Sequence, residues 1–176
     1  MIQYAITQGL VDRSKLIIAG WSQGGYLAYL SAVRNGTHEF GWRFAGAVAG
    51  AGVTDWDSMT MSSDLGYFQA QLAGGSSWSL ERGDLRSRAG SPIWAFKRGA
   101  KLGNIPPMLM LHGASDQRVP LAQAIGFRRA LAEAQLPYQL TVCPGEGHYL
   151  KKREHISVGV HTVCIFQIIT RSDFST

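Results

Sequence analysis

A serine, an aspartate and a histidine follow one another along the chain in an order that suits nucleophilic catalysis. Ser22 lies in the pentapeptide Gly20-Trp21-Ser22-Gln23-Gly24, a G-x-S-x-G pattern whose serine is a nucleophile when a strand precedes it and a helix follows. A histidine such as His148 can take the serine proton, and an acid such as Asp116 can hold that histidine in the productive tautomer. Ser22, Asp116 and His148 are therefore the candidate catalytic residues for acyl transfer.

The residues around Ser22 fit a turn from strand to helix. Residues 16–19 form a continuous apolar run, which predicts a strand buried on both faces of a parallel sheet. Residues 24–33 carry apolar side chains at helical spacing and predict the helix that follows. We expect a strained backbone at Ser22, with Gly20 and Gly24 allowing strand and helix to approach. A glycine-rich turn with an inert serine is the alternative interpretation.

The first helical residue after the serine has a chemical use of its own. The backbone N–H of Gln23 would lie at the positive end of the predicted helix, where it could donate to a developing oxyanion. Gln23 is therefore the candidate oxyanion residue.

The acid and the histidine each follow a predicted strand. Asp116 comes after the strand predicted for residues 108–111, and His148 after the one predicted for residues 138–142. Parallel sheets place functional groups beyond the carboxyl ends of their strands, and the order Ser, Asp, His is typical of this arrangement. Taken singly, the aspartate could instead cap a helix and the histidine could be an ordinary surface residue. Packing or capping would explain two other candidates, His112 and Asp57.

The remaining chain completes an α/β pattern in a single domain. A further strand is predicted for residues 44–49, and helices are predicted from Pro92 to Gly99 and from Pro120 to about Gln135, with residues 52–90 as a long polar, glycine-rich stretch. Strands that alternate with helices form a parallel sheet with flanking helices. About four strands are expected.

Composition argues against several classes of protein. The net charge is +5 in 176 residues, but the basic residues are scattered, so we expect no nucleic-acid partner. The apolar run Val163–Ile169 is too short to span a bilayer, and no membrane partner is expected. No metal or other cofactor is expected either, because His161 and Cys164 are a lone pair and no H-E-x-x-H pattern occurs.

The chain resembles the C-terminal part of the catalytic domain of the prolyl oligopeptidase family, especially its dipeptidyl and acylaminoacyl peptidase branch. The resemblance rests on Gly20-Trp21-Ser22-Gln23-Gly24-Gly25-Tyr26, on His112-Gly113 through Asp116 to Val119-Pro120, and on Glu146-Gly147-His148. It implies an α/β-hydrolase fold and a serine-type peptidase that cleaves peptide substrates through an acyl-enzyme. A carboxylesterase or lipase-like hydrolase with the same three residues is the alternative.

The same resemblance suggests residues that bind substrate. In that family, the residues that match Tyr26, Val53, Trp56 and Val119 are expected to wall the pocket for the side chain before the scissile bond. An ordinary core aromatic is the alternative interpretation of Trp56.

Departures from the family pattern lead to further expectations. The resemblance implies earlier strands and a second oxyanion donor, which would lie before Met1. We therefore expect residues 1–155 to be the C-terminal part of the hydrolase domain and residues 156–176 an atypical segment. An inactive truncated fragment, able to associate through an exposed sheet edge, is a further hypothesis. A soluble protein is expected, whose compartment, cytoplasmic or secreted, depends on sequence upstream of Met1.

Overall fold

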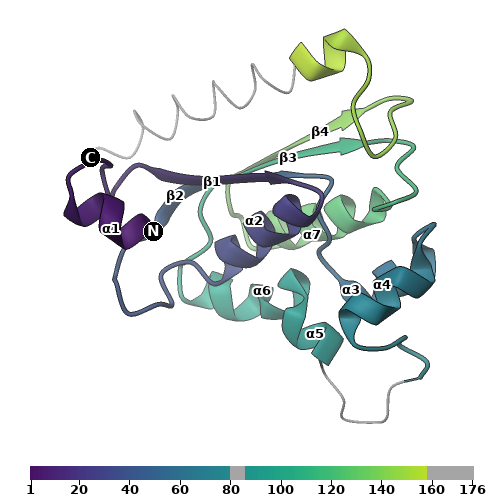
Figure 1. Ribbon diagram of the computed structural model, residues 1–176, viewed down its shortest axis with the longest axis horizontal. Helices are drawn as coiled ribbons and strands as arrows, with labels where there is room; N and C mark the ends of the chain where they lie inside the picture. Colours follow the sequence, from purple (N-terminus) through teal and green to yellow (C-terminus); the bar gives the residue numbers. More distant parts are fainter. Residues whose placement is uncertain (80–85, 158–176) are drawn as a thin grey trace.

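A four-stranded parallel sheet forms the centre of the structure, a computed structural model that describes residues 1–79 and 86–157. The strands are β1 (Leu16–Trp21), β2 (Phe44–Gly50), β3 (Met108–Gly113) and β4 (Tyr138–Cys143), side by side in that order. All neighbouring pairs are parallel, and the arrowheads of β1, β3 and β4 point the same way in Figure 1. The predicted α/β architecture with about four parallel strands is confirmed.

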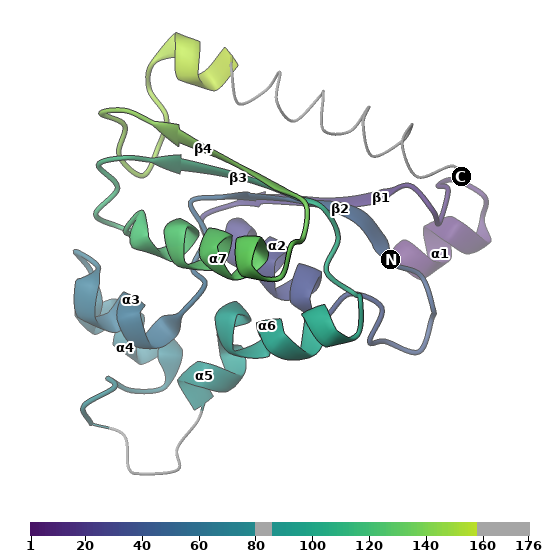
Figure 2. The same cartoon turned by 180° about the vertical axis from the view of Figure 1, so that it is seen from behind.

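Three helices cover one face of the sheet: α2 (Gln23–Val33), α6 (Pro92–Lys101) and α7 (Ala122–Glu133) (Figures 1 and 2). Side chains alternate between the two faces of a strand, so every second residue of the inner strands reaches these helices. The resulting core joins strand residues to three helix aromatics, and its members include Ala47, Ala49, Met108, Met110, Tyr29, Phe96 and Phe127. This core fixes the helix after Ser22 against the sheet.

The opposite face of the sheet carries a smaller apolar cluster. Val48, Leu109 and Leu111 are buried there, with Ile17 and Trp21 packed against them. The prediction that β1 is buried on both faces is wrong, because Ile17 and Ile18 are only half-buried and Ala19 is exposed. The physical reason is position: β1 is an outer strand of the described sheet, with β2 on one side only.

Besides a helical turn at residues 153–157, four further helices complete the described structure. They are α1 (Ile2–Thr7), α3 (Trp56–Ser62), α4 (Gly66–Ala73) and α5 (Arg86–Gly90). The last three lie in the stretch expected to be polar and glycine-rich, which therefore contains more regular structure than the sequence suggested. Figure 1 places α3 and α4 on the side of the molecule toward which the strands point. Residues 158–176, with His161 and Cys164, lie outside the described part of the chain.

Candidate active site

Ser22 occupies a strained turn between β1 and α2. Its backbone has φ +57° and ψ −117°, which is a costly conformation for a residue with a side chain. Its N–H donates a 2.8 Å hydrogen bond to the carbonyl of Gly50 at the end of β2. The turn therefore holds the serine at the carboxyl edge of the sheet, as the sequence pattern predicts.

Two glycines make this close approach of strand and helix possible, but they are not the predicted pair. A Cβ on Gly20 would overlap the backbone of Gly24, and one on Gly25 would overlap the carbonyl of Gly50. A Cβ on Gly24 would meet nothing within 4 Å. The role expected of Gly24 thus belongs to Gly25, which lies against β2 on the inner side of the helix.

Hydrogen bonds connect Ser22, His148 and Asp116. The Nε2 atom of His148 lies 2.8 Å from Oγ of Ser22, and its Nδ1 atom lies 2.9 Å from Oδ2 of Asp116. The three residues are 126 and 32 positions apart in the chain, so only the fold brings them together. In this arrangement the imidazole can accept the hydroxyl proton at Nε2 while Nδ1–H donates to the carboxylate.

The loop after β3 orients the carboxylate of Asp116. Its side chain is fully buried, and its Oδ1 atom accepts hydrogen bonds of 2.9 Å from the backbone N–H groups of Arg118 and Val119. Oδ2 is left facing His148. The aspartate thus uses one oxygen to shape its own loop and the other to hold the imidazole.

His112 lies close to this group without joining it. Its ring is fully buried, with Nε2 at 2.7 Å from the carbonyl of Val119 and 3.5 Å from Oδ2 of Asp116. Burial lowers the pKa of His112, against the opposing effects of the Val119 carbonyl and the Asp116 charge. A neutral His112 that donates from Nε2 to Val119 fits these contacts, and packing explains this residue as expected.

A cavity of about 210 Å³ lies beside the serine turn. It is lined by Gln23, Tyr26, Trp56, Leu72, Ala73, Ser87 and Gly90. The rings of Tyr26 and Trp56 meet edge to face at 5.4 Å, and the hydroxyl of Tyr26 donates a 2.9 Å hydrogen bond to the carbonyl of Gly90. The walls combine apolar side chains with the polar groups of Gln23 and Ser87, and two of their side chains are locked by packing and hydrogen bonding.

Of the four residues expected to line a substrate pocket, two line the cavity and two are buried next to it. Tyr26 and Trp56 line the cavity, whereas Val53 and Val119 are buried behind it in the same apolar cluster. Gln23 contributes to the cavity wall and is also the first residue of α2. The N–H of a first helical residue has no acceptor within its own helix, so Gln23 has a backbone donor next to Ser22.

Sequence reasoning missed the part of the wall that comes from α4 and α5. Leu72, Ala73, Ser87 and Gly90 lie in the stretch described from the sequence only as polar and glycine-rich. The one available signal was the Ser91-Pro92 start of the next helix, which marks where that stretch ends.

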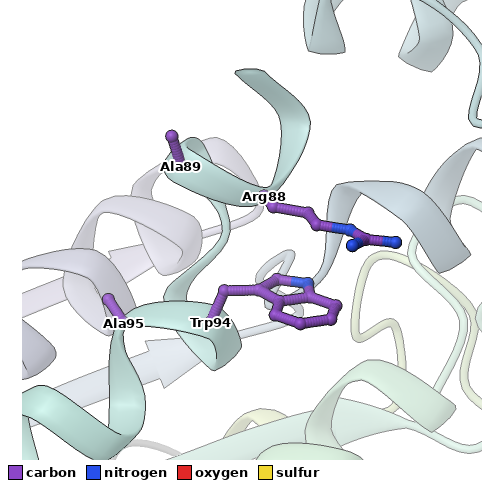
Figure 3. Close-up of a pocket in the computed structure, with 4 residues that line it drawn as sticks. All are labelled: Arg88, Ala89, Trp94 and Ala95. Carbon is purple, nitrogen blue, oxygen red and sulfur yellow. The ribbon is translucent and has the colours of Figure 1, made fainter. Parts of the chain in front are cut away.

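Asp57 anchors the α5 side of this wall. Its carboxylate accepts a 2.7 Å hydrogen bond from the hydroxyl of Ser87 and a 2.8 Å bond from Nε of Arg88. The Arg88 guanidinium also lies 4.5 Å from the centre of the Trp94 ring (Figure 3). Burial disfavours ionisation, but the bonds from Arg88 and Ser87 outweigh it and lower the pKa of Asp57. Asp57 is thus explained by structure, as expected for this residue.

A metal site and a membrane span each require features that can be sought in residues 1–79 and 86–157. No group of three or more His, Cys, Asp or Glu side chains in these ranges could hold a metal ion. No helix in them has the length and apolar character that crossing a membrane requires.

Known structures share this fold. A puromycin-hydrolyzing peptidase of Mycobacterium tuberculosis superposes with a TM-score of 0.80 at 24% identity, over 96% of this chain and 24% of that one. The acylaminoacyl peptidase of Pyrococcus horikoshii gives a TM-score of 0.75 at 20% identity, over 97% of this chain and 26% of that one. At these identities the likeness establishes the fold, and the predicted α/β-hydrolase fold is confirmed.

Curated relatives are similar in sequence over most of the chain. Acylamino-acid-releasing enzyme 2 of Oryza sativa is 30% identical in an alignment of 156 residues that covers 84% of this chain and 19% of that protein. Dipeptidyl peptidase family member 6 of Caenorhabditis elegans is 25% identical over 158 residues, 88% of this chain and 20% of that protein. The chain spans about one fifth of the length of these relatives.

One protein-family model matches a range that includes all the residues that the structure describes. The model of the prolyl oligopeptidase family matches residues 1–167, which include the serine turn, the acid loop and the histidine loop. The resemblance inferred from those three segments is thereby confirmed. The chain belongs to the prolyl oligopeptidase family.

Proposed function

We propose that this chain carries the catalytic centre of a serine peptidase, with Ser22 as nucleophile, His148 as general base and acid, and Asp116 as the orienting acid. The observation that carries the proposal is the continuous hydrogen-bonded connection Ser22–His148–Asp116, with bonds of 2.8 and 2.9 Å, built on a positive-φ serine turn. Its members come from three separate loops, so their alignment is a property of the fold.

The geometry supports an acyl-enzyme mechanism. Ser22 Oγ attacks the carbonyl carbon of the scissile bond while Nε2 of His148 takes the hydroxyl proton. The C–O bond forms, the carbonyl π electrons move to oxygen, and the N–H of Gln23 donates to that oxyanion. On collapse, His148 returns the proton to the leaving amine as the C–N bond breaks. A water molecule, deprotonated by the same imidazole, then attacks the acyl carbon, and the bond between that carbon and Ser22 Oγ breaks as His148 returns the proton to Oγ.

The pocket supports a peptide substrate with an apolar side chain next to the scissile bond. Tyr26, Trp56, Leu72 and Ala73 provide apolar surface beside Ser22, and burial of such surface contributes about 25 cal/mol per Å². A cavity of about 210 Å³ can admit a single side chain. The acylamino-acid-releasing and dipeptidyl peptidase names of the relatives accord with peptide cleavage.

Steady-state kinetics of the intact protein test this function. Peptide anilides and the matching esters, each with an apolar residue before the scissile bond, are compared in wild-type protein and in Ser22→Ala. We expect the wild type to cleave both and Ser22→Ala to lose about 10³-fold or more in kcat. Cleavage of esters alone would instead support an esterase. Anilide cleavage that survives Ser22→Ala would contradict the proposal.

A further inference from the structure

Glu146 is a buried carboxylate two residues before His148, and the mechanism above does not use it. Only 3% of its surface is exposed. Its Oε2 atom accepts from the backbone N–H of Lys151 at 3.0 Å, and its Oε1 atom accepts from the N–H of Lys152 at 2.8 Å. Nδ1 of His155 lies 2.8 Å from the same Oε1. A buried charge is tolerated where donors surround it in this way.

All three donors lie in the segment that follows the histidine. Lys151, Lys152 and His155 come five, six and nine residues after Glu146, so the side chain of Glu146 bridges the loop that contains His148. The last of these donors, His155, lies within a helical turn formed by residues 153–157. The carboxylate therefore joins the two ends of the loop and connects it to that helical turn.

The backbone of Glu146 is fixed at the same time to the loop that carries Asp116. Its carbonyl accepts a 2.8 Å hydrogen bond from the N–H of Ser115. Gly113, at the end of β3, has no room for a Cβ against the backbone of Glu146 and Gly147. The acid loop and the histidine loop are thus in direct contact. The backbone of Glu146 makes this contact, and its side chain joins the two ends of the histidine loop.

We propose that Glu146 is a positioning residue for His148: its carboxylate closes the histidine loop and so keeps the imidazole within reach of Ser22 and Asp116 together. This inference rests on the proposed function. His148 must hold Nε2 at 2.8 Å and Nδ1 at 2.9 Å from its two partners at once. Misplacement of a reacting group by about 1 Å can cost about 10²-fold in rate, so loosening the loop should act on turnover.

The closure should hold throughout the pH range in which a histidine titrates. The N–H of Lys151, then His155 and the N–H of Lys152, lower the pKa of Glu146 from 4.5 to about 2. An ordinary histidine changes charge near pH 6.5. Glu146 consequently remains a charged acceptor throughout that range.

Glu146→Gln in the intact protein tests this role. The amide oxygen can still accept from Lys152 and His155, but the amide NH2 faces the N–H of Lys151 and has nothing to accept with. We expect kcat for a peptide anilide to fall about 10- to 100-fold with KM within about twofold of wild type, because the pocket lies on other elements. His155→Ala removes one donor and should cause a smaller fall, of about two- to fivefold.

Asp12→Asn is the matched control. Asp12 also accepts a backbone N–H, that of Ser14 at 2.9 Å, and its pKa is also lowered to about 2. It lies in the turn before β1, away from the histidine loop. We expect Asp12→Asn to keep kcat within about twofold of wild type.

The pH profile separates positioning from mere loss of folded protein. The acid limb of kcat/KM reports the pKa of the general base in free enzyme. Displacement of the imidazole changes its surroundings, so the limb should move from its wild-type position in Glu146→Gln. A simple loss of folded enzyme lowers kcat/KM at every pH by the same factor and leaves the pH of the acid limb unchanged.

Three results would overturn the proposal. Wild-type kcat in both Glu146→Gln and His155→Ala would overturn it while leaving the proposed function intact. Reduced amplitude with an unmoved acid limb would assign Glu146 a structural role only. Absence of Ser22-dependent hydrolysis in the wild type would overturn the proposed function and, with it, this inference.

Discussion

The indole N–H of Trp21 donates a 3.0 Å hydrogen bond to the backbone carbonyl of His148. The residue before the candidate nucleophile thus holds the residue that would activate it, across 127 positions of sequence. The hydrogen bond joins the end of β1 to the loop that contains His148, next to the place where Ser22 and His148 meet.

Trp21→Phe should weaken this connection while keeping an aromatic ring against Leu109 and Leu111. One neutral hydrogen bond contributes about 1 kcal/mol, so we expect kcat/KM to fall about fivefold. Steady-state kinetics on a peptide anilide give this ratio, and thermal unfolding shows whether the fold is kept. Unchanged kcat/KM in Trp21→Phe would show that the bond does not position the histidine loop.

Gly25→Ala and Gly24→Ala should have opposite effects, although the two positions are adjacent. A Cβ on Gly25 would overlap the carbonyl of Gly50, whereas a Cβ on Gly24 meets open space. We expect Gly25→Ala to destabilise the fold by about 1–3 kcal/mol or more and Gly24→Ala to stabilise it by up to about 1 kcal/mol. Urea denaturation measures both. Equal midpoints for the two variants would contradict the packing described for the serine turn.

The sequence predicted the strands and the candidate triad because local patterns mark them. Ser22 lies in a short motif between an apolar run and a helical pattern, and Asp116 and His148 each follow a strand at the expected edge. Their side-chain roles stay predictions that the kinetic experiments address.

Helix α4 was missed because its large apolar residues do not lie on its buried face. Tyr67, Phe68 and Leu72 are exposed, while the buried positions include Gln69 and two alanines. Apolar periodicity therefore indicates no clear inner face. The outer position of β1 was missed for a related reason: an apolar run looks the same in a central and in an outer strand.

Asp57→Asn should affect the substrate pocket selectively. The amide loses one of the acceptor oxygens that bind Ser87 and Arg88, so the α5 wall is held less firmly beside Trp56. We expect KM to rise about fivefold for substrates with phenylalanine before the scissile bond, a change of about 1 kcal/mol. KM for the matching glycine substrate should stay within about twofold, since glycine does not fill the pocket. Equal changes for both substrates would argue against an effect through the pocket.

His112 should make stability depend on pH. Burial lowers its pKa below the usual value of 6.5, so the unfolded chain binds a proton at a higher pH than the folded one. Stability is then full above about pH 6.5 and is lost as pH falls toward the folded pKa, by at most about 1.4 kcal/mol per pH unit.

His112→Gln removes this titrating group while its amide can still donate to Val119. We expect its melting temperature to fall less than that of wild type between pH 7.5 and 5.5, as measured by calorimetry. Parallel pH dependence in the two proteins would show that His112 is not held neutral by the fold.

Activation of Ser22 by His148 can be measured by locating a fluorophosphonate adduct by mass spectrometry in the intact protein. We expect the wild type to carry the adduct on Ser22 and His148→Ala to lose nearly all of it, because the serine then lacks its general base. An adduct on a different residue, or one on Ser22 that forms equally fast in His148→Ala, would contradict activation of Ser22 by His148.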